Sequence, residues 1–253
     1  MHKVPENLLL PDWPAPEQVR AVSSKRTGGY SGQGFASLNL GDHVGDEPTA
    51  VARNRRLFQT LSAMPTKPYW LQQVHGVAVA RPDLECNQTG PIVADAAYSR
   101  SAERVCIVMT ADCLPLLLCD KAGREVAAVH AGWRGLAAGV IEQTVKQFQA
   151  KPADILVWLG PAIGPQAFEV GAEVRAAFIK QQAAASAAFT TQPSAKYLAD
   201  LYLLARLRLQ ALGISAIYGG NFCTYQQADD FFSYRRDGQT GRMATAIWLE
   251  TPQ

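Results

Sequence analysis

Three residues whose side chains bind transition metals lie at the edges of predicted elements: His75, Cys113 and His130. Cys113 separates two apolar runs, and His130 ends a third. One thiolate and two neutral imidazoles suit a borderline-soft ion such as Zn²⁺, with a fourth position open to water or substrate. The pattern is therefore compatible with a catalytic metal site. The spacing alone does not bring the three residues together, and a free cysteine is more commonly a buried core residue.

Asp112 precedes Cys113 in an otherwise apolar neighbourhood. A buried carboxylate is unfavourable unless it is paired, so we expect Asp112 to have partners. Beside Cys113 it could orient a ligand or carry a proton, which makes Asp112, Cys113 and His130 the candidate catalytic residues. Capping of a turn between two strands is an equally good interpretation of Asp112.

Arginines near glycine-rich turns are the candidates for binding an anion. Arg26 precedes Gly28-Gly29, Arg134 lies in the turn after His130, and Arg235 belongs to an Arg-Arg pair. A guanidinium fork matches phosphate or carboxylate, and glycine backbone can approach an oxyanion closely. Solvated surface arginines are the alternative interpretation.

Composition limits the other classes of function. The chain has four histidines and no His-x-His pair, which excludes the clustered ligands of a true multicopper centre. There are 24 basic and 22 acidic residues, a net charge of +2, and no long basic run, so we expect no nucleic-acid partner and no membrane partner. Five cysteines without a CxxC pair, and no signal-peptide pattern, predict reduced thiols and a cytoplasmic location.

Closely spaced apolar runs of strand length outnumber the helical patterns. We expect strands at residues 105–109, 114–118, 126–129, 155–159, 214–218 and 246–249, and helices at 51–61, 137–148 and 198–212. Residues 181–188 are alanine-rich and are interpreted as a surface segment. Because strands and helices do not alternate strictly, the predicted fold is α+β, with mixed or antiparallel sheets flanked by helices. It is one domain over residues 1–253, with 1–19 as its N-terminal extension.

Several motifs occur in the order typical of one known family. They are Lys25-Arg26-Thr27-Gly28-Gly29-Tyr30-Ser31, Ser37-Leu38-Asn39-Leu40-Gly41, Asn54-Arg55-Arg56, Gln72-Gln73-Val74-His75-Gly76, Ala94-Asp95-Ala96, Thr110-Ala111-Asp112-Cys113-Leu114-Pro115, His130-Ala131-Gly132-Trp133-Arg134-Gly135, Leu159-Gly160-Pro161-Ala162-Ile163-Gly164, Cys223-Thr224 and Phe232-Ser233-Tyr234-Arg235-Arg236. On these motifs the chain resembles the polyphenol oxidoreductase (laccase-domain) family, also called the YfiH-like or peptidoglycan editing factor family. The resemblance runs from about Arg20 to Leu249. One departure is Gln166, where many members carry a cysteine that is not a metal ligand.

The resemblance implies a single α+β domain with one metal, held by His75, Cys113 and His130. It also implies zinc-dependent phosphorolysis of adenosine, inosine, guanosine and methylthioadenosine, together with deamination of adenosine. Purine nucleosides and phosphate would then be the partners, and the protein would be a monomer or weak oligomer. Phosphate would be held by Arg26, Arg235 or Arg134, and Asp112 would carry a proton during deamination.

Two alternatives of other classes stay open at this stage. In a metal-free cysteine hydrolase, Cys113 would be the nucleophile and His130 the base, and editing of peptidoglycan precursors is a related physiological role. In a copper-dependent phenol oxidase, Cu²⁺ would replace Zn²⁺ on the same three ligands, since copper binds such sites more tightly.

Overall fold

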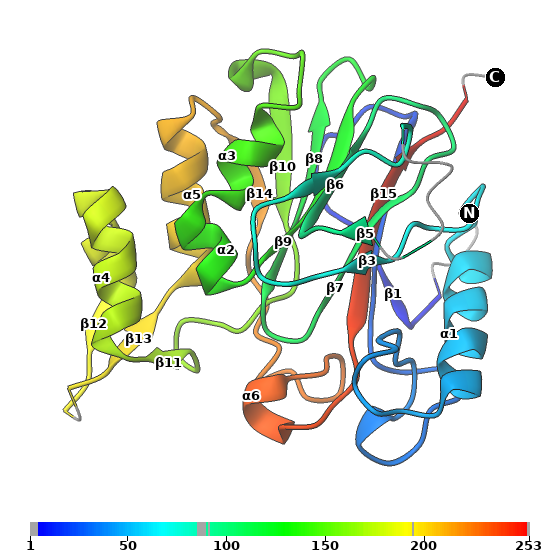
Figure 1. The fold of residues 1–253 in the computed structure, drawn as a ribbon, viewed down its shortest axis with the longest axis horizontal. Coiled ribbons are helices and arrows are strands. Elements are labelled where there is room, and N and C mark those ends of the chain that lie inside the picture. The colour runs from blue at the N-terminus through cyan, green and yellow to red at the C-terminus, as the bar shows by residue number, and fades with distance from the viewer. Residues whose placement is uncertain (1–4, 85–89, 91, 194, 252–253) are drawn as a thin grey trace.

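Two β-sheets packed face to face form the centre of the structure, and helices cover both outer faces (Figure 1). The computed structural model describes residues 5–84, 90, 92–193 and 195–251. The first sheet is antiparallel and contains, in spatial order, β1 (Leu8–Leu9), β2 (Val19–Ser24), β15 (Met243–Leu249) and β7 (Cys106–Thr110).

The second sheet is mixed. In spatial order it contains β14 (Ala216–Gly219), β10 (Ile155–Leu159), β8 (Leu114–Asp120), β9 (Val126–Ala131), β6 (Ala96–Ser99) and β4 (Val79–Ala80). Only the two edge pairs, β14 with β10 and β4 with β6, are parallel. Two small sheets complete the set, formed by β11 (Glu169–Val170), β13 (Tyr197–Ala199) and β12 (Phe189–Thr191), and by β3 (Leu71–Gln72) with β5 (Ile92–Val93).

Helices flank these sheets. They are α1 (Pro48–Leu61), α2 (Trp133–Ala138), α3 (Val140–Val145), α4 (Ala172–Gln181), α5 (Leu201–Ala211) and α6 (Tyr234–Asp237), with short 3-10 turns at Gln33–Phe35, Pro152–Asp154 and Ala183–Ala188. Figure 1 shows α2, α3 and α5 together on one side of the molecule and α1 on the opposite side.

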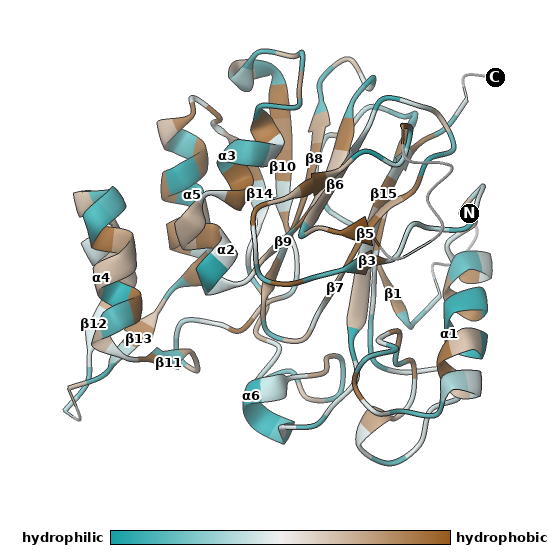
Figure 2. Ribbon diagram, viewed as in Figure 1, coloured by the Kyte–Doolittle hydropathy of each residue, from teal (hydrophilic) through white to brown (hydrophobic). Residues whose placement is uncertain are grey.

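The central strands β7 to β10 are apolar except at a few positions near their ends, because both of their faces are buried. In β9, Val129 packs toward α3 and α5, whereas Ala128 packs toward β7 and β15 of the other sheet. The opposite face of the four-stranded sheet is covered by α1, where Phe58 is fully buried against Ile107 and Trp248. The hydropathy colouring shows this apolar centre and the mixed character of the flanking helices (Figure 2).

The predicted α+β fold with mixed and antiparallel sheets is confirmed, and the helix boundaries are refined. The predicted helix at 137–148 is two helices, because Gly139 has φ +100° and ends α2 in the left-handed conformation. The predicted helix at 198–212 begins later, since Leu198 belongs to β13 and Asp200 caps α5 by accepting a hydrogen bond from the Leu203 N–H.

The interpretation of residues 181–188 as a surface segment is wrong for two of its alanines. Ala185 and Ala188 are 3% and 2% exposed and pack into the core beside α4 and α5. The small side chains permit this close packing. An alanine-rich composition alone does not distinguish a segment that packs in this way from one that faces solvent.

Cysteine placement agrees with the expectation for the core. Cys106 and Cys119 are fully buried, Cys113 is half-buried, and all of them are free thiols, as is Cys223. Cys86 lies outside the described residues. In the part of the chain that the structure describes, no helix has the length and hydropathy needed to cross a membrane.

The hydroxyl of Tyr202 fixes the loop after β10. It accepts a hydrogen bond from the Ala162 N–H (2.9 Å) and lies 3.1 Å from the carbonyl oxygens of Gly160 and Phe222. We expect Tyr202→Phe to lower the free energy of unfolding by about 1–3 kcal/mol, because the buried Ala162 N–H loses its acceptor. Urea unfolding measures this change.

Tyr218→Phe is the matched control, since the Tyr218 hydroxyl has no hydrogen bond to any other described residue. It should change the free energy of unfolding by less than about 0.5 kcal/mol. Equal losses for the two variants would contradict the role assigned to the Tyr202 hydroxyl.

Candidate metal centre and active site

The candidate site lies at the end of the two sheets, where the chain turns from β7 into β8. Thr110 ends β7 and Leu114 begins β8, so the intervening turn crosses from one sheet to the other. Asp112 in this turn has φ +89°, a conformation rare for a non-glycine residue. Such strained residues often occur at functional sites.

Strand pairing brings Cys113 and His130 together. Leu114 pairs with Ala131 and Pro115 with His130, which places Cys113 beside Gly132. His75 reaches the same point from the connection between β3 and β4, at φ +60°. Its exposed ring lies edge-on to that of the buried His130, with centroids 4.8 Å apart.

The three side chains fit a metal ion. Their ligand atoms all lie within 4.8 Å of one another, and Cys113 Sγ is 3.7 Å from His75 Nε2. Tetrahedral zinc with ordinary Zn–S and Zn–N bonds separates its ligand atoms by roughly 3.3–3.8 Å, so the sulfur–nitrogen distance already matches. The structure therefore brings together all three predicted ligands.

Asp95 connects the two histidines, and the sequence analysis gave it no separate role. Its carboxylate lies 2.8 Å from His130 Nδ1 and accepts hydrogen bonds from the N–H groups of Val74, His75 and Gly76 (3.2, 2.9 and 2.7 Å). The signal that could have found Asp95 is the one that singled out Asp112, a lone acidic residue in an apolar stretch.

Cys113 and His130 each favour the charged form of the other and so shift each other's pKa. Burial alone would raise the pKa of the Cys113 thiol, but the charge and hydrogen bond of His130, followed by those of His75, lower it to about 6. Burial opposes protonation of His130, yet the Cys113 thiolate and the hydrogen bond to Asp95 raise its pKa to about 9. The thiolate is thus the favoured form of Cys113 at neutral pH, which is the form that ligates metals.

Asp112 has the partners that its burial requires. One carboxylate oxygen accepts a hydrogen bond from the Thr224 hydroxyl (2.6 Å), and the other accepts one from the backbone N–H of Arg235 (2.7 Å). The second contact lies in the first turn of α6, whose residues form part of the cavity wall. Asp112 therefore lines the site and also fixes the position of α6.

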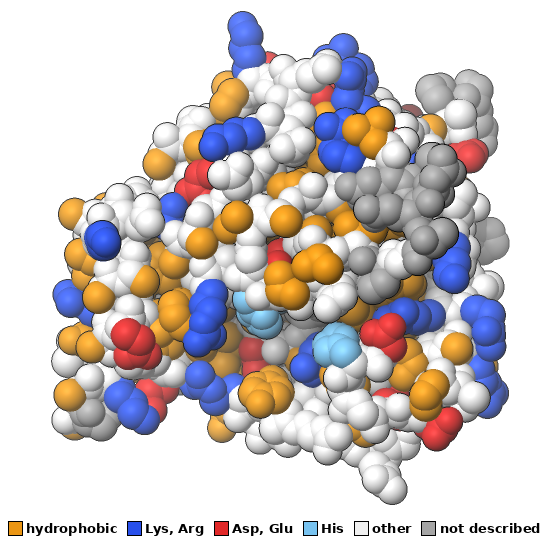
Figure 3. All heavy atoms as spheres, viewed as in Figure 1, with side chains coloured by type: hydrophobic (Ala, Val, Ile, Leu, Met, Phe, Trp, Pro, Cys, Tyr) orange, Lys and Arg blue, Asp and Glu red, His pale blue; other side chains and the backbone are white. Residues whose placement is uncertain are grey.

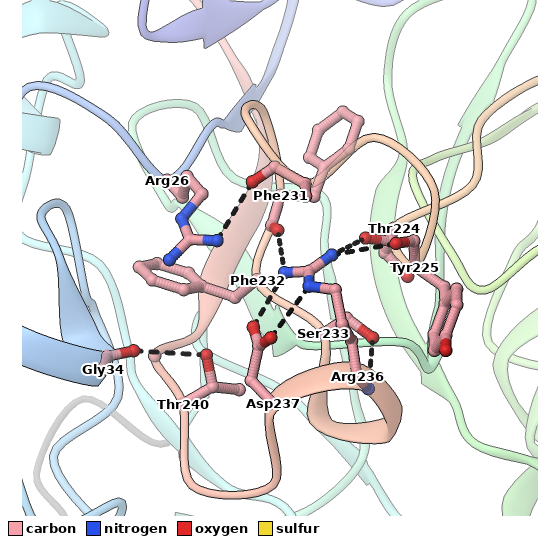
Figure 4. A network of polar contacts seen from close by, with 12 residues as sticks. Arg26, Gly34, Thr224, Tyr225, Phe231, Phe232, Ser233, Arg236, Asp237 and Thr240 are labelled. Carbon is pink, nitrogen blue, oxygen red and sulfur yellow. Dashed lines mark hydrogen bonds and ion pairs between the residues drawn. The ribbon is translucent and has the colours of Figure 1, made fainter.

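Arg236 connects α6 to the backbone of the preceding loop (Figure 4). Its guanidinium pairs with Asp237 and donates to the carbonyl oxygens of Thr224, Tyr225 and Phe231. Arg236 lies outside the cavity lining and its contacts are with the protein itself, so we assign it a structural role.

A cavity of about 380 Å³ opens over the three ligands. Its lining residues are His43, Gln73, His75, Met109, Thr110, Ala111, Asp112, Cys113, His130, Ile163, Phe168, Tyr234, Arg235 and Arg242. Figure 3 shows histidine and basic side chains around a hollow in this face, above the position of α6. The combination of apolar walls with a few polar groups is typical of a small-molecule site.

The structure places only one of the three predicted phosphate-binding arginines at this cavity. Arg235 lines it, with its guanidinium near the Phe168 ring and one nitrogen donating to the Glu169 carbonyl oxygen (2.9 Å). Arg26 instead stacks on Phe232 and donates to backbone carbonyls, as Figure 4 shows in part, and Arg134 stacks on Trp133 outside the cavity lining.

Arg242 is a cavity arginine that the sequence analysis missed. Burial lowers the pKa of its guanidinium, while Cys113 and Asp112 oppose that effect. One of its nitrogens donates to the carbonyl oxygens of Thr240 and Gly241. It precedes β15 without any motif, so only the fold reveals its position.

The fold and the site together define a class: α+β proteins in which two histidines and one cysteine form a candidate metal centre below a small cavity. The family model for multi-copper polyphenol oxidoreductase laccase matches residues 20–250, and the chain belongs to this family.

Relatives with similar sequences cover nearly the whole chain. A Shigella flexneri protein named purine nucleoside phosphorylase YfiH is 57% identical over 242 residues, which cover 96% of this chain and 98% of that protein. The Escherichia coli (strain K12) protein of the same name is 55% identical over the same shares. The crystal structure of a Neisseria meningitidis protein matches with a TM-score of 0.93 at 48% identity, covering 97% of this chain and 100% of that one.

Gly132 leaves the space that the ligands need. A Cβ atom there would lie 2.6 Å from His75 Cδ2 and 3.1 Å from Cys113 Sγ, although the backbone conformation of Gly132 suits any residue. If these residues hold a metal, we expect Gly132→Ala to displace His75 and to weaken the binding of added Zn²⁺ by about tenfold or more, the scale on which lost supporting contacts act. Competition with a chromogenic chelator measures the affinity.

Gly32→Ala provides the control, since a Cβ atom at Gly32 would meet no atom within 4 Å and its φ is −109°. Zinc affinity in this variant should equal that of the wild type. If Gly132→Ala also bound zinc as tightly as the wild type, the ligand arrangement described above would be wrong.

Proposed function

We propose that the protein is a zinc-dependent purine nucleoside phosphorylase, which converts a nucleoside and phosphate into the free base and ribose 1-phosphate. The observation that carries the proposal is the grouping of His75, Cys113 and His130 below the cavity. Relatives that are 50–57% identical and bear the phosphorylase name support an enzyme of this kind.

The lining of the cavity supports this substrate class. Phe168, Ile163 and Met109 provide apolar surface against which a planar purine would pack, and Tyr234 adds an aromatic ring. Arg235 and Arg242 provide positive charge in the same space, and a guanidinium suits a phosphate oxyanion. We propose these two arginines as the phosphate ligands, in place of Arg26 and Arg134.

Zinc held by His75, Cys113 and His130 would supply a Lewis acid that polarises a substrate oxygen. The residues around it have separate tasks. Arg235 and Arg242 would hold phosphate toward C1′ of the ribose, where the new C–O bond forms as the C–N bond to the base breaks. Asp112 is the proposed proton carrier: it would take the proton that phosphate loses as its oxygen attacks C1′ and would pass that proton to the departing base. Its two hydrogen bonds fix the direction of its carboxylate.

Deamination of adenosine is proposed as a second reaction of the same site. It consumes water rather than phosphate and converts the C6 amino group into a carbonyl, so that inosine and ammonia are the products. The phosphate-binding arginines are not needed for this reaction. The proposed cytoplasmic location and the monomeric or weakly oligomeric state remain predictions.

A metal-free cysteine hydrolase is the second candidate, and one observation favours it. Cys113, His130 and Asp95 lie in the order nucleophile, base and orienting carboxylate, and the pKa of Cys113 is lowered to about 6. Editing of peptidoglycan precursors would use the same residues. This candidate requires that thiol alkylation of metal-stripped protein abolish the activity and that zinc inhibit it.

The metal requirement distinguishes these proposals. We expect about one zinc per wild-type chain, and adenine released from adenosine only when phosphate is present. Chelation should abolish this activity and added zinc should restore it, because the ligands are otherwise unchanged. His75→Ala should lower zinc content and lower phosphorolysis by more than about 100-fold, since one of three ligands is lost. Full phosphorolysis in zinc-free protein would contradict the proposal.

The two cavity arginines should affect phosphate more than nucleoside. We expect Arg235→Ala and Arg242→Ala each to raise the KM for phosphate by about 10–100-fold, the scale of a lost charge-assisted hydrogen bond. Inosine formation without phosphate should change much less. Arg134→Ala is the control, because Arg134 lies outside the cavity lining, and an equal KM effect there would contradict the assignment.

A further inference from the structure

Asp95 is a fully buried carboxylate that faces four N–H groups. Oδ1 lies 2.9 Å from the His75 backbone nitrogen and 2.8 Å from His130 Nδ1, and Oδ2 accepts from the N–H groups of Gly76 and Val74. The carboxylate therefore lies at the point where the two histidine ligands meet.

On its N-terminal side, the segment that carries His75 is held by the Gln73 side chain, which exchanges two hydrogen bonds with the backbone of Met109 (2.7 and 2.8 Å). β3, which precedes it, pairs with the two-residue strand β5, and His75 itself is exposed at φ +60°. Three successive backbone N–H groups of this turn point at one carboxylate, an arrangement that stabilises an anion in a concave stretch of backbone. The anion in turn compensates for the strained conformation of His75.

The contact with His130 fixes the orientation of its ring. When Nδ1 donates to the carboxylate, Nε2 has no proton in the neutral ring and can bind a metal. The backbone holds Asp95 in place, because its N–H donates to the Ala78 carbonyl and its own carbonyl accepts from the His130 N–H (2.7 Å). Backbone hydrogen bonds thus fix Asp95 separately from the contact of its carboxylate with the His130 ring.

We propose that Asp95 is the positioning residue of the metal site, which holds both histidine ligands in binding geometry through one carboxylate. The inference rests on the proposed metal site and assigns Asp95 no contact with substrate. An asparagine cannot replace it, because its single carbonyl oxygen can satisfy one side of the carboxylate only. Its amide N–H₂ would then face either the N–H groups of Val74 and Gly76 or those of His75 and His130.

Zinc binding to Asp95→Asn tests the proposal without an activity assay. Chelator competition should give an affinity about 10–100-fold below that of the wild type. Cobalt(II) substitution should give a weaker and shifted absorption spectrum, because the d–d and sulfur-to-metal bands depend on ligand geometry. Hydrogen exchange of the amides at Val74, His75 and Gly76 should be faster in the metal-free variant than in the metal-free wild type.

Glu125→Gln is the matched control. Glu125, at the far end of β9 from His130, is also a buried carboxylate, and its two oxygens accept hydrogen bonds from the N–H groups of Gln149 and Ala150 and from the Tyr98 hydroxyl. We expect it to destabilise the fold while zinc affinity, the cobalt spectrum and exchange at residues 74–76 stay at wild-type values. Equal loss of zinc affinity in both variants would overturn the proposal in favour of general destabilisation.

A measurement on the unmutated chain keeps the inference testable if Asp95→Asn does not fold. In the zinc-loaded wild type, nitrogen NMR should find His130 Nδ1 protonated, with a slowly exchanging proton, and Nε2 bound to the metal. The reverse tautomer would overturn the proposal, as would a folded Asp95→Asn with wild-type zinc affinity and cobalt spectrum. A wild type that binds no zinc would instead refute the underlying metal site.

Discussion

The register of β8 on β9 is the constraint on which the site depends. Pro115 lies opposite His130 and Leu114 opposite Ala131, so the turn before β8 delivers Cys113 to the end of β9. A slip of one residue would turn every side chain of β9 to the other face of the sheet and direct His130 toward α3. Burial on both faces prevents this slip, because Leu116 and Leu117 each fill a separate apolar layer and could not exchange places without loss.

At the open end of the sheets, buried anions organise loops that the apolar core does not reach. Asp95 gathers the turn around His75, and Asp112 gathers Thr224 and the first turn of α6. Either carboxylate would be costly to bury alone, and each is satisfied by N–H or O–H donors from a segment distant in sequence. The polar groups thus determine where the loops lie, and the sheets determine where the polar groups lie.

The residues able to carry chemistry and the positions of the central strands could be predicted from the sequence, whereas contacts between residues distant in the sequence could not. The apolar runs predict β7 to β10 well because each strand is buried on both faces. His75 lies beside Cys113 because of the path of the connection between β3 and β4, and the spacing of residues in the sequence does not encode this path. The expectation that the two residues share a metal came from the family resemblance. Arg26 was misleading for a physical reason: near glycine-rich turns a guanidinium finds backbone carbonyls and aromatic rings as readily as a ligand.

The name of the family refers to several copper ions, whereas the group formed by His75, Cys113 and His130 suits one ion. Oxidases that reduce dioxygen with several coppers need clustered histidines, and this chain has four in all. In the described residues His43 pairs with Asp42 at the cavity wall, outside the group formed by His75, Cys113 and His130. A thiolate with two imidazoles binds either Zn²⁺ or Cu²⁺, so metal supply can change the ion without changing the ligands. The arginines and apolar walls of the cavity would remain, and they favour a polar transfer reaction at a nucleoside over electron transfer from a phenol.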